Sequence, residues 1–423
     1  MKVLLIAKHS RTGGAAIASS RLLEALRKAD MDASMLVQEG RDEEKAIYST
    51  THGAIKRWIN LLRFIMERLV FLPREKSPNI RFLFSLANTG ESIKGNSMVR
   101  EADVIHLHWI NAGFLSLRSL KALLNLGKPV VWTFHDMWPF TGGCHYALEC
   151  EEYTRECGQC PYLKRPGTGD LSHRIWLKKK EIFNSGKFTV ITPSKWLKEC
   201  VRASSLLHDL GVHTIHNPID SFFFQPADRE QACRSLKLDP TKKYILFGAA
   251  TVKNVMKGYS YFAEAIKLLS ANVNPDQVEI LLFGKSKDNE ADAFPLRTRN
   301  IAFVRSVDTL VQLYSVAHLF VIPSLQDNLP NTILESMLCG TPVVGFKTGG
   351  IPEMIDHKRN GYMADFKSSA DLAEGIQWVL SMETYDTLSR ETRESVLRRY
   401  PAKGSVDAHI KLYKTLLDKT FST

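Results

Sequence analysis

The densest group of residues able to do chemistry lies in the segment His318 to Gly350, HLFVIPSLQDNLPNTILESMLCGTPVVGFKTGG. Its pattern predicts strand, loop, helix and strand, with Pro330 at the helix entrance and Gly340 just past the helix end. The N–H groups of Asn331 and Thr332 at that helix start have no acceptor within the helix, and the helix dipole favours an anion beside them. We therefore expect this segment to bind a negatively charged group.

Two carboxylates flank the expected anion site, Asp327 in the loop and Glu335 one turn inside the helix. Carboxylates are poor ligands for phosphate, but they accept short hydrogen bonds from hydroxyl groups. The combination favours a ligand that carries both a phosphate and a sugar. An N-terminal capping acid followed by a solvated helix residue is the alternative, and this segment alone leaves it open.

Two places in the first half of the chain could also contact a ligand. Gly13 and Gly14 precede a helix that starts near Ala16, so that the backbone can approach a ligand closely. The spacing G-x-G-x-x-G of dinucleotide-binding loops is absent, and a tight turn is the alternative. His135 ends the expected strand PVVWTFHD, where it could bond a sugar or polarise a diphosphate, a basic side chain being suited to an anionic transition state. A structural histidine is the alternative there.

Four cysteines lie close together in an insert over residues 142–163. They are separated by five, six and two residues, and are Cys144, Cys150, Cys157 and Cys160. Four thiolates could complete a closed, structural zinc site, in which His145 could replace one thiolate. Four reduced thiols packed in the insert are the alternative. A metal with four protein ligands has no open position, so we expect no catalysis by it.

Composition predicts a globular protein of two domains. The chain has 423 residues, 44% of them hydrophobic and 24% charged, and lacks an uncharged apolar stretch of about 20 residues. Its start, MKVLLIAKHSRTGG, is typical of a first strand rather than of a secretory signal, so we expect a cytoplasmic location and reduced cysteines. The net charge of +11 favours anionic partners. No nucleic acid is expected, because the basic residues are spread without a binding motif.

The elements that must position these residues follow the alternation of strands and helices typical of parallel α/β sheets. The first expected series of strands is Lys2–Ala7, Ala33–Gln38, Asp103–Trp109, Pro129–Asp136, Lys187–Pro193 and His213–His216. The second series is Lys243–Ala249, Gln277–Gly284, Asn300–Val304, His318–Pro323 and Pro342–Phe346. Helices are expected at Gly258–Ser270, Asp308–Val316, Asn331–Cys339, Ala370–Met382 and Val406–Leu417.

The expected fold is therefore α/β, with two Rossmann-like domains that face each other across a cleft. The first domain covers residues 1–217 and the second covers residues 218–400. A C-terminal helix within residues 401–423 is expected to cross back to the first domain. In open sheets of this kind ligands bind at the carboxyl ends of the strands.

The residues of the segment His318 to Gly350 resemble the signature of a known family. Pro323, Ser324, Asp327, seven further residues, Glu335 and then the run from Cys339 to Val344 resemble the donor-site signature of glycosyltransferase family 4. Asp327 stands where the family usually has Glu, and Asn328 and Pro330 replace glycines. The resemblance implies the GT-B fold, with a second domain that binds the donor and a first domain that binds the acceptor.

The resemblance also implies roles for individual residues. Asp327 would hold hydroxyls of the donor sugar, and Glu335 the nucleotide ribose. Main-chain N–H groups would contact the sugar near Leu329 and the diphosphate at Asn331 and Thr332. Pro330 has no N–H to donate, so one usual contact would be missing.

A second match lies upstream, where a strand leads into a loop that ends with Lys257 and Gly258. Family members carry Lys-Gly there, and the lysine would contact the diphosphate. They commonly have an arginine six residues earlier, where this chain has Thr251, so Lys257 would act alone or with Lys253. In the first domain the family has a histidine in the region of His135. The resemblance places the Gly13–Gly14 loop against the donor diphosphate or the acceptor.

The expected activity is that of a retaining hexosyltransferase without a catalytic metal or other cofactor. It would move a sugar from a UDP- or GDP-sugar to a glycan or a lipid-linked glycan in the biosynthesis of a surface polysaccharide such as capsule or lipopolysaccharide. The acceptor hydroxyl would attack the face from which the leaving group departs. A sugar-nucleotide epimerase and a non-catalytic sugar-nucleotide-binding module are the alternatives.

The segment Ala54 to Pro73, AIKRWINLLRFIMERLVFLP, has the pattern of a basic amphipathic helix. Such a helix can lie in the surface of an anionic membrane, which would place the protein peripherally on the inner membrane face and suit a lipid-linked acceptor. A helix buried against the first domain is the alternative.

Overall fold

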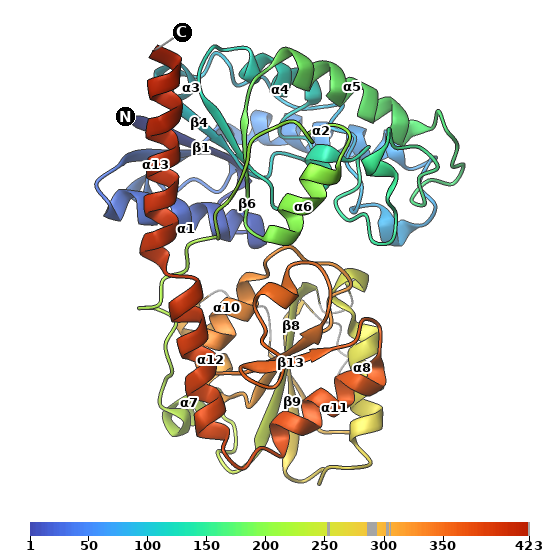
Figure 1. The fold of residues 1–423 in the computed structure, drawn as a ribbon, viewed down its shortest axis with the longest axis vertical. Coiled ribbons are helices and arrows are strands. Elements are labelled where there is room, and N and C mark those ends of the chain that lie inside the picture. Colours follow the sequence, from blue (N-terminus) through green and yellow to red (C-terminus); the bar gives the residue numbers. More distant parts are fainter. Residues whose placement is uncertain (252–253, 286–293, 302–303, 305, 422–423) are drawn as a thin grey trace. The chain divides into compact units, whose positions relative to one another are not determined.

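The computed structural model describes residues 1–251, 254–285, 294–301, 304 and 306–421. The chain folds into two compact units (Figure 1). The first contains Met1–Pro218 and Lys403–Thr423, and the second contains Ile219–Ala402. Each unit is built on one sheet whose strands are all paired in parallel. The predicted fold class, α/β with two Rossmann-like domains, is confirmed.

The sheet of the first unit has seven strands in the order β3-β2-β1-β4-β5-β6-β7. Their bounds are β1 Lys2–His9, β2 Asp32–Glu39, β3 Ile47–Ser49, β4 Val104–Leu107, β5 Val130–Thr133, β6 Thr189–Thr192 and β7 Val212–Thr214. The connection from β1 goes to β2 on one side, and β4 returns on the other side. The order therefore reverses between β1 and β4, where open sheets bind ligands.

Both faces of this sheet are buried, which explains its nearly continuous apolar strands. In β1, Val3 and Leu5 belong to one core cluster, while Leu4 and Ile6 belong to the cluster on the opposite face. The helices of this unit are α1 Gly14–Lys28, α2 Gly53–Phe71, α3 Ser97–Glu101, α4 Leu117–Leu124, α5 Leu171–Ser185, α6 Lys195–Ala203 and α13 Ala402–Phe421.

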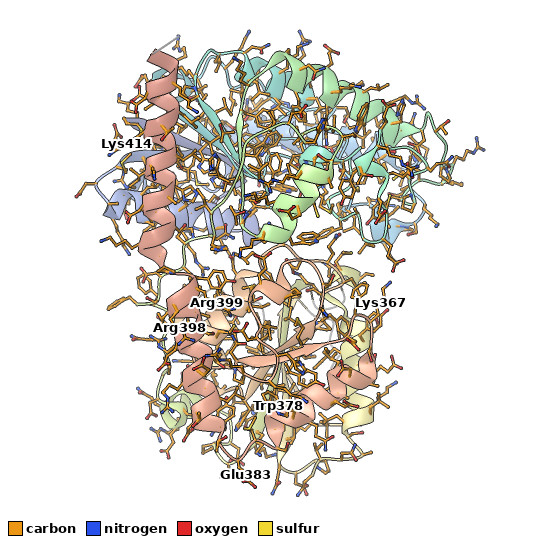
Figure 2. The ribbon with its side chains drawn as sticks, in the orientation of Figure 1. Lys367, Trp378, Glu383, Arg398, Arg399 and Lys414 are labelled. Carbon is orange, nitrogen blue, oxygen red and sulfur yellow. The ribbon has the colours of Figure 1, made fainter. Side chains whose placement is uncertain are left out.

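The last helix, α13, belongs to the first unit although almost two hundred residues of the second unit precede it. Tyr413 of α13 is fully buried and shares a core cluster with residues of β1 and α1. Its hydroxyl lies 2.7 Å from Nδ1 of His106 in β4. Figure 2 labels Lys414, the next residue, on this helix.

The sheet of the second unit has six strands in the order β10-β9-β8-β11-β12-β13. Their bounds are β8 Lys243–Thr251, β9 Val278–Lys285, β10 Thr298–Ile301, β11 Leu319–Ile322, β12 Val343–Phe346 and β13 Gly361–Ala364. The helices are α7 Arg229–Leu236, α8 Tyr259–Leu269, α9 Val307–Val316, α10 Asn331–Leu338, α11 Ser369–Leu380 and α12 Tyr385–Arg399. The strand order reverses between β8 and β11, again the expected ligand position.

Most strands lie where the sequence predicts them, whereas α3 to α7 and α12 have no counterpart among the expected helices. The edge strands β3 and β13 are short and lack a β-branched run, and α12, YDTLSRETRESVLRR, has too few apolar residues to show a helical stripe. The strand expected at Asn300–Val304 is shifted, since β10 is Thr298–Ile301; residues 302 and 303 lie outside the described residues.

Candidate functional site

The predicted donor residues of the second unit lie where β8 and β11 end, at the reversal of strand order. Lys257 closes the short helical turn Val255–Lys257 after β8. Asp327 and Leu329 lie in the loop between β11 and α10. The arrangement of the sheet thus brings together residues that are seventy positions apart in the sequence.

A glycine allows the turn after β8 to pack closely against the loop between β11 and α10. Gly258 has a φ of 69°, and a Cβ atom placed there would lie 1.8 Å from the carbonyl oxygen of Pro323. The Leu325 N–H also donates to the Met256 carbonyl at 2.9 Å. Only glycine permits this approach, which explains the Lys-Gly pair in physical terms.

This contact sets Lys257 against Asp327. The Lys257 ammonium group donates to Oδ2 of Asp327 in an ion pair, and the Ser324 hydroxyl donates to the same oxygen at 3.3 Å. The side chains of Lys257 and Asp327 are 30% and 17% exposed, so both remain reachable from solvent. The structure therefore places a cation and a carboxylate side by side at the predicted site.

The Asp327 backbone is fixed from the other side by the loop after β12. Gly349 has a φ of 58°, and a Cβ atom there would lie 2.0 Å from the Asp327 carbonyl oxygen. The Gly350 N–H donates to that oxygen at 3.0 Å. Gly349 and Gly350 were not predicted as site residues, because nothing local in the sequence indicates this contact.

The N-terminus of α10 lies directly after this loop. Pro330 is the residue before the first helical residue, Asn331, one position earlier than the first helical turn where proline is usual. It provides no side-chain cap, and its carbonyl accepts from the Ile333 N–H at 3.1 Å. Asn331 and Thr332 therefore begin the helix, as predicted, and Leu329 is buried before it at 5% exposure.

The other end of α10 is closed as the sequence predicts. Gly340 has a φ of 79° and donates its N–H to the Met337 carbonyl at 3.0 Å. The Thr341 N–H donates to the Ser336 carbonyl at 3.0 Å. This left-handed ending satisfies the last carbonyls of the helix and fixes the direction of α10, and hence of its N-terminus.

Glu335 lies one turn inside α10, and the structure buries it. It is 4% exposed, and its Oε2 accepts a hydrogen bond from the Tyr314 hydroxyl of α9 at 3.1 Å. The alternative of a solvated helix residue is therefore wrong. Burial raises the pKa of the nearby Cys339 thiol to about 12, and the charge of Glu335 adds to that shift. The predicted role of Glu335 at a ribose stays a prediction.

The arrangement could bind a ligand that carries both an anionic group and hydroxyl groups. The Lys257 cation and the start of α10 offer positive charge to an anion, while Asp327 offers an acceptor for hydroxyl groups. Lys253, the second lysine considered for the diphosphate, lies outside the described residues. The roles of the donor-site residues stay predictions.

In the first unit, Gly13 and Gly14 lie where β1 leads into α1. Gly13 is the residue before the helix and has a φ of 92°, a conformation that favours glycine. Its carbonyl accepts from the Ile17 N–H at 3.1 Å, and it offers no side-chain cap. The loop lies at the carboxyl end of β1, at the reversal of strand order in this sheet.

His135 follows β5 and contacts a second histidine. Its Nε2 lies 3.0 Å from Nδ1 of His108, so one ring donates and the other accepts. Burial lowers the pKa of His135 to about 4. The ring is neutral at pH 7, so the expected basic side chain is replaced by a neutral hydrogen-bonding group.

His108 and His106 flank the end of β4. Burial lowers both of their pKa values well below the usual value. His106 is fully buried and has both ring nitrogens engaged, one with Tyr413 at 2.7 Å and the other with the Thr133 hydroxyl at 2.7 Å. His106 is therefore a packed residue.

Asp136 organises a polar network that the sequence does not reveal. Its Oδ2 accepts from Trp109 Nε1 at 3.0 Å and lies 2.8 Å from His145 Nδ1. The other nitrogen of His145 lies 2.9 Å from the Ser85 hydroxyl. Burial opposes ionisation of Asp136, but its charge and hydrogen-bond partners, His145 foremost, lower its pKa. Both ring nitrogens of His145 are thus engaged in this network, and its role as a replacement for one thiolate in a zinc site stays a prediction.

The four cysteines of the insert line one small cavity of ≈ 20 Å³, which has room for about one water molecule. The Gly142 N–H donates to Sγ of Cys157 at 3.1 Å. Burial raises the pKa of Cys144 to about 11 and of Cys157 to about 12, so both are protonated at pH 7 in this state. Among the residues that the structure describes, no three Cys, His, Asp or Glu side chains form a group that could hold a metal ion. The structural zinc stays a prediction.

A second, larger cavity of ≈ 630 Å³ opens in the first unit beside the ends of β1, β2 and β4. Its lining includes Lys8, Glu39 and Trp109 at those strand ends, and Arg57 and Phe64 of α2. Burial lowers the pKa of Lys8, whose ammonium group donates to the Ala112 carbonyl. This cavity lies at the ligand-binding edge of the first sheet and has the volume of a small-molecule site.

None of the helices in the described part of the chain combines the length and the apolar character that a bilayer crossing requires.

Comparisons with known proteins agree with this fold. A sequence profile of glycosyltransferase family 4 matches residues 12–221, and a profile of group 1 glycosyl transferases matches residues 242–382. An uncharacterized glycosyltransferase of Methanocaldococcus jannaschii is 28% identical over 348 residues, which cover 78% of this chain and 87% of the relative.

Solved structures resemble the whole chain. Sucrose-phosphate synthase from Thermosynechococcus elongatus matches with a TM-score of 0.69 at 18% identity, over 99% of this chain and 100% of that chain. Anabaena HepE, solved in complex with UDP-glucose, matches with a TM-score of 0.64 at 16% identity, over 98% of this chain and 100% of that chain. At these identities the two structures show the fold alone. From its profiles, relatives and fold, the chain belongs to glycosyltransferase family 4 and has the GT-B architecture.

Proposed function

We propose that this glycosyltransferase moves a hexose from a UDP- or GDP-sugar, with retention of configuration, to a glycan or lipid-linked glycan. The product would serve a surface polysaccharide such as capsule or lipopolysaccharide. The contact between Lys257 and Asp327 at the start of α10 carries the proposal, because it sets an anion ligand beside a hydroxyl acceptor. The UDP-glucose held by Anabaena HepE supports a nucleotide sugar as the donor.

In the proposed reaction the donor replaces the internal ion pair. The diphosphate binds the Lys257 ammonium group and the N–H groups that begin α10, and these positive ends stabilise the charge of the departing nucleoside diphosphate. Asp327 then accepts hydrogen bonds from sugar hydroxyls. Glu335, held by Tyr314, accepts from the ribose hydroxyls after a change of side-chain position.

The chemistry needs no protein nucleophile. The acceptor hydroxyl attacks the anomeric carbon on the face that the diphosphate leaves, and the leaving phosphate oxygen takes the hydroxyl proton. His135 of the first unit is neutral at pH 7, so its proposed contribution is a hydrogen bond rather than a charge. We place the acceptor in the ≈ 630 Å³ cavity of the first unit.

The test separates transfer from its two alternatives. The full chain is incubated with UDP- and GDP-sugars that raise its melting temperature, with and without membranes that supply glycan acceptors, and in the presence of EDTA. We expect release of nucleoside diphosphate that depends on the acceptor and persists with EDTA. An epimerised sugar nucleotide would indicate an epimerase, and binding without any turnover would indicate a binding module.

Glu335→Gln keeps an acceptor for the Tyr314 hydroxyl and removes the carboxylate charge. We expect turnover to fall by at least an order of magnitude, since a charged hydrogen bond contributes about 1.5–3 kcal/mol. The matched control is Glu383→Gln, at an exposed position of the same unit (Figure 2). Equal turnover in the two variants, with equal melting temperatures, would remove Glu335 from the proposal.

A further inference from the structure

Helix α2 turns its polar side chains inward. Asn60 is 4% exposed and donates to the Thr51 hydroxyl at 2.7 Å. Glu67 is fully buried and accepts from the Leu86 N–H at 2.9 Å. Arg68 is 9% exposed and donates to the Phe84 carbonyl at 2.9 Å. These contacts anchor the helix to the first unit through its hydrophilic side, the reverse of a helix that covers a hydrophobic core.

Most of the large apolar side chains of α2 are exposed, whereas Phe71 at its end is buried. Eight of the 21 exposed large apolar side chains among the described residues lie on this helix. They are Ile55, Trp58, Ile59, Leu61, Leu62, Ile65, Met66 and Leu69. Phe82, 68% exposed, stacks on Phe64 of α2 with the ring centroids 6.4 Å apart and extends this surface. A contiguous apolar surface of this kind on a folded unit indicates an apolar partner.

The expectation of a basic membrane helix needs correction. Lys56 and Arg63 pair with the buried Glu91 at 2.6 and 3.4 Å, and Arg68 pairs with Glu67 at 2.7 Å. Three of the four basic residues of the helix are therefore engaged inside the first unit. The alternative expectation, a helix buried against the domain, is also wrong for its apolar side.

Within residues 53–76 the exposed charged side chains all have one sign. Arg57 on α2 and Arg74 and Lys76 just after it are exposed, whereas the acids of residues 53–76, Glu67 and Glu75, are buried. A positive border beside exposed Trp and Leu side chains is complementary to acyl chains beneath anionic headgroups. It is less suited to a second copy of this chain, which carries the same positive charge there.

We propose that α2 and Phe82 lie in the surface of an anionic lipid bilayer, with the apolar side chains among the acyl chains and the three exposed basic residues at lipid phosphates. The inference does not depend on the transfer reaction. Arg57, Leu61 and Phe64 also line the ≈ 630 Å³ cavity, which therefore opens at the boundary of lipid and water. A lipid-anchored acceptor can reach that cavity without leaving the bilayer.

Co-sedimentation of the full chain with vesicles tests the docking surface. We expect binding to vesicles of phosphatidylglycerol and phosphatidylcholine and much weaker binding to phosphatidylcholine alone. Trp58→Ser combined with Leu62→Ser should weaken binding on the order of tenfold or more, because each residue loses burial in lipid. Both positions are over half exposed, at 65% and 55%, so the fold should persist. Phe222→Ser, at a 75% exposed site in the second unit, is the matched control.

The charge is tested separately. Arg74→Glu combined with Lys76→Glu should abolish the preference for phosphatidylglycerol, whereas Lys414→Glu, on the exposed side of α13 (Figure 2), should leave it. Trp58→Phe should keep vesicle binding but lose the blue shift of tryptophan fluorescence that lipid causes in the original chain.

Three results would overturn the proposal. The first is the absence of binding to phosphatidylglycerol vesicles, and the second is equal binding by the Trp58→Ser, Leu62→Ser double variant. The third is a dimer in solution that this double variant converts to monomers, which would assign the apolar surface to a second copy. Melting temperatures of all variants exclude loss of folding as the cause.

Discussion

Replacement of Lys257 by alanine tests the phosphate-binding part of the proposed donor site separately from the sugar-binding part. Lys257 and Asp327 form an ion pair, so in the proposed role the lysine would exchange a carboxylate for a diphosphate when the donor binds. We predict that Lys257→Ala weakens binding of free UDP or GDP and of the corresponding nucleotide sugar to a similar extent. The reason is that the diphosphate is common to both ligands.

The expected size follows from the contact that is lost. A hydrogen bond between charged groups contributes about 1.5–3 kcal/mol, which corresponds to roughly 10- to 100-fold in Kd. The effect on folding should be small. With side chains 30% and 17% exposed, the pair is screened by solvent and stabilises the fold by about 0–1 kcal/mol. Weaker binding would therefore report the lost contact rather than unfolding.

Asp327→Asn should behave differently. Without its carboxylate partner, Lys257 no longer has to break an ion pair, so free UDP or GDP should bind as tightly as before or more tightly. The nucleotide sugar should gain less or lose affinity, because its hydroxyls lose a charged acceptor. The ratio of the two affinities thus distinguishes a sugar ligand from a phosphate ligand.

Isothermal titration of the full chain and its variants measures both affinities. The matched control is Lys267→Ala, which removes an exposed lysine from the last turn of α8, the end opposite Lys257. Unchanged binding of the free nucleotide by Lys257→Ala would refute the assignment of that lysine. Equal weakening of both ligands by Asp327→Asn would refute the assignment of the carboxylate to sugar hydroxyls.

Two further predictions concern the first unit. Burial lowers the pKa of His409 from its usual 6.5 to about 4. Between these two pH values the unfolded chain binds a proton that the folded chain does not. The free energy of unfolding should therefore fall on acidification by about 1.4 kcal/mol per pH unit for this residue. Urea unfolding at several pH values should show a shallower fall for His409→Gln, and an unchanged slope would contradict the reasoning. Elemental analysis of the full chain should find about one zinc, lost in Cys160→Ser, if the cysteines form the predicted closed site; a metal-free protein whose seven cysteines all react as thiols would contradict it.

The sequence predicts the strand ends well, and with them much of the candidate donor site. Asp327 and Lys257 follow apolar strands, and the carboxyl ends of neighbouring parallel strands meet at one edge. The contacts that hold them are not local. Nothing in the residues around Gly349 indicates that its missing side chain makes room for the Asp327 carbonyl, 22 positions earlier. Such close approaches become visible only when the sheet is formed.

The periodicity of the α2 sequence does not determine how the helix is oriented on the protein. It identifies a polar and an apolar side of the segment, but it does not say which side faces the protein. The inward side is decided by Glu67 and Arg68, whose partners are backbone groups near Leu86 and Phe84. Those partners come from an irregular segment without a pattern of its own. The same limit applies to His145, which the sequence places among cysteines and the structure pairs with Asp136.

The membership of α13 in the first unit has a consequence for synthesis on the ribosome. The second unit is continuous in the chain, so it can complete its fold as it emerges. The first unit emerges earlier, but it then lacks the helix that carries Tyr413. The hydroxyl of Tyr413 forms a hydrogen bond with His106 of β4. Its core on that face stays incomplete until α13 has been synthesised. Premature stop codons just before α13 should therefore yield chains whose early half is recognised by chaperones while the later half is native.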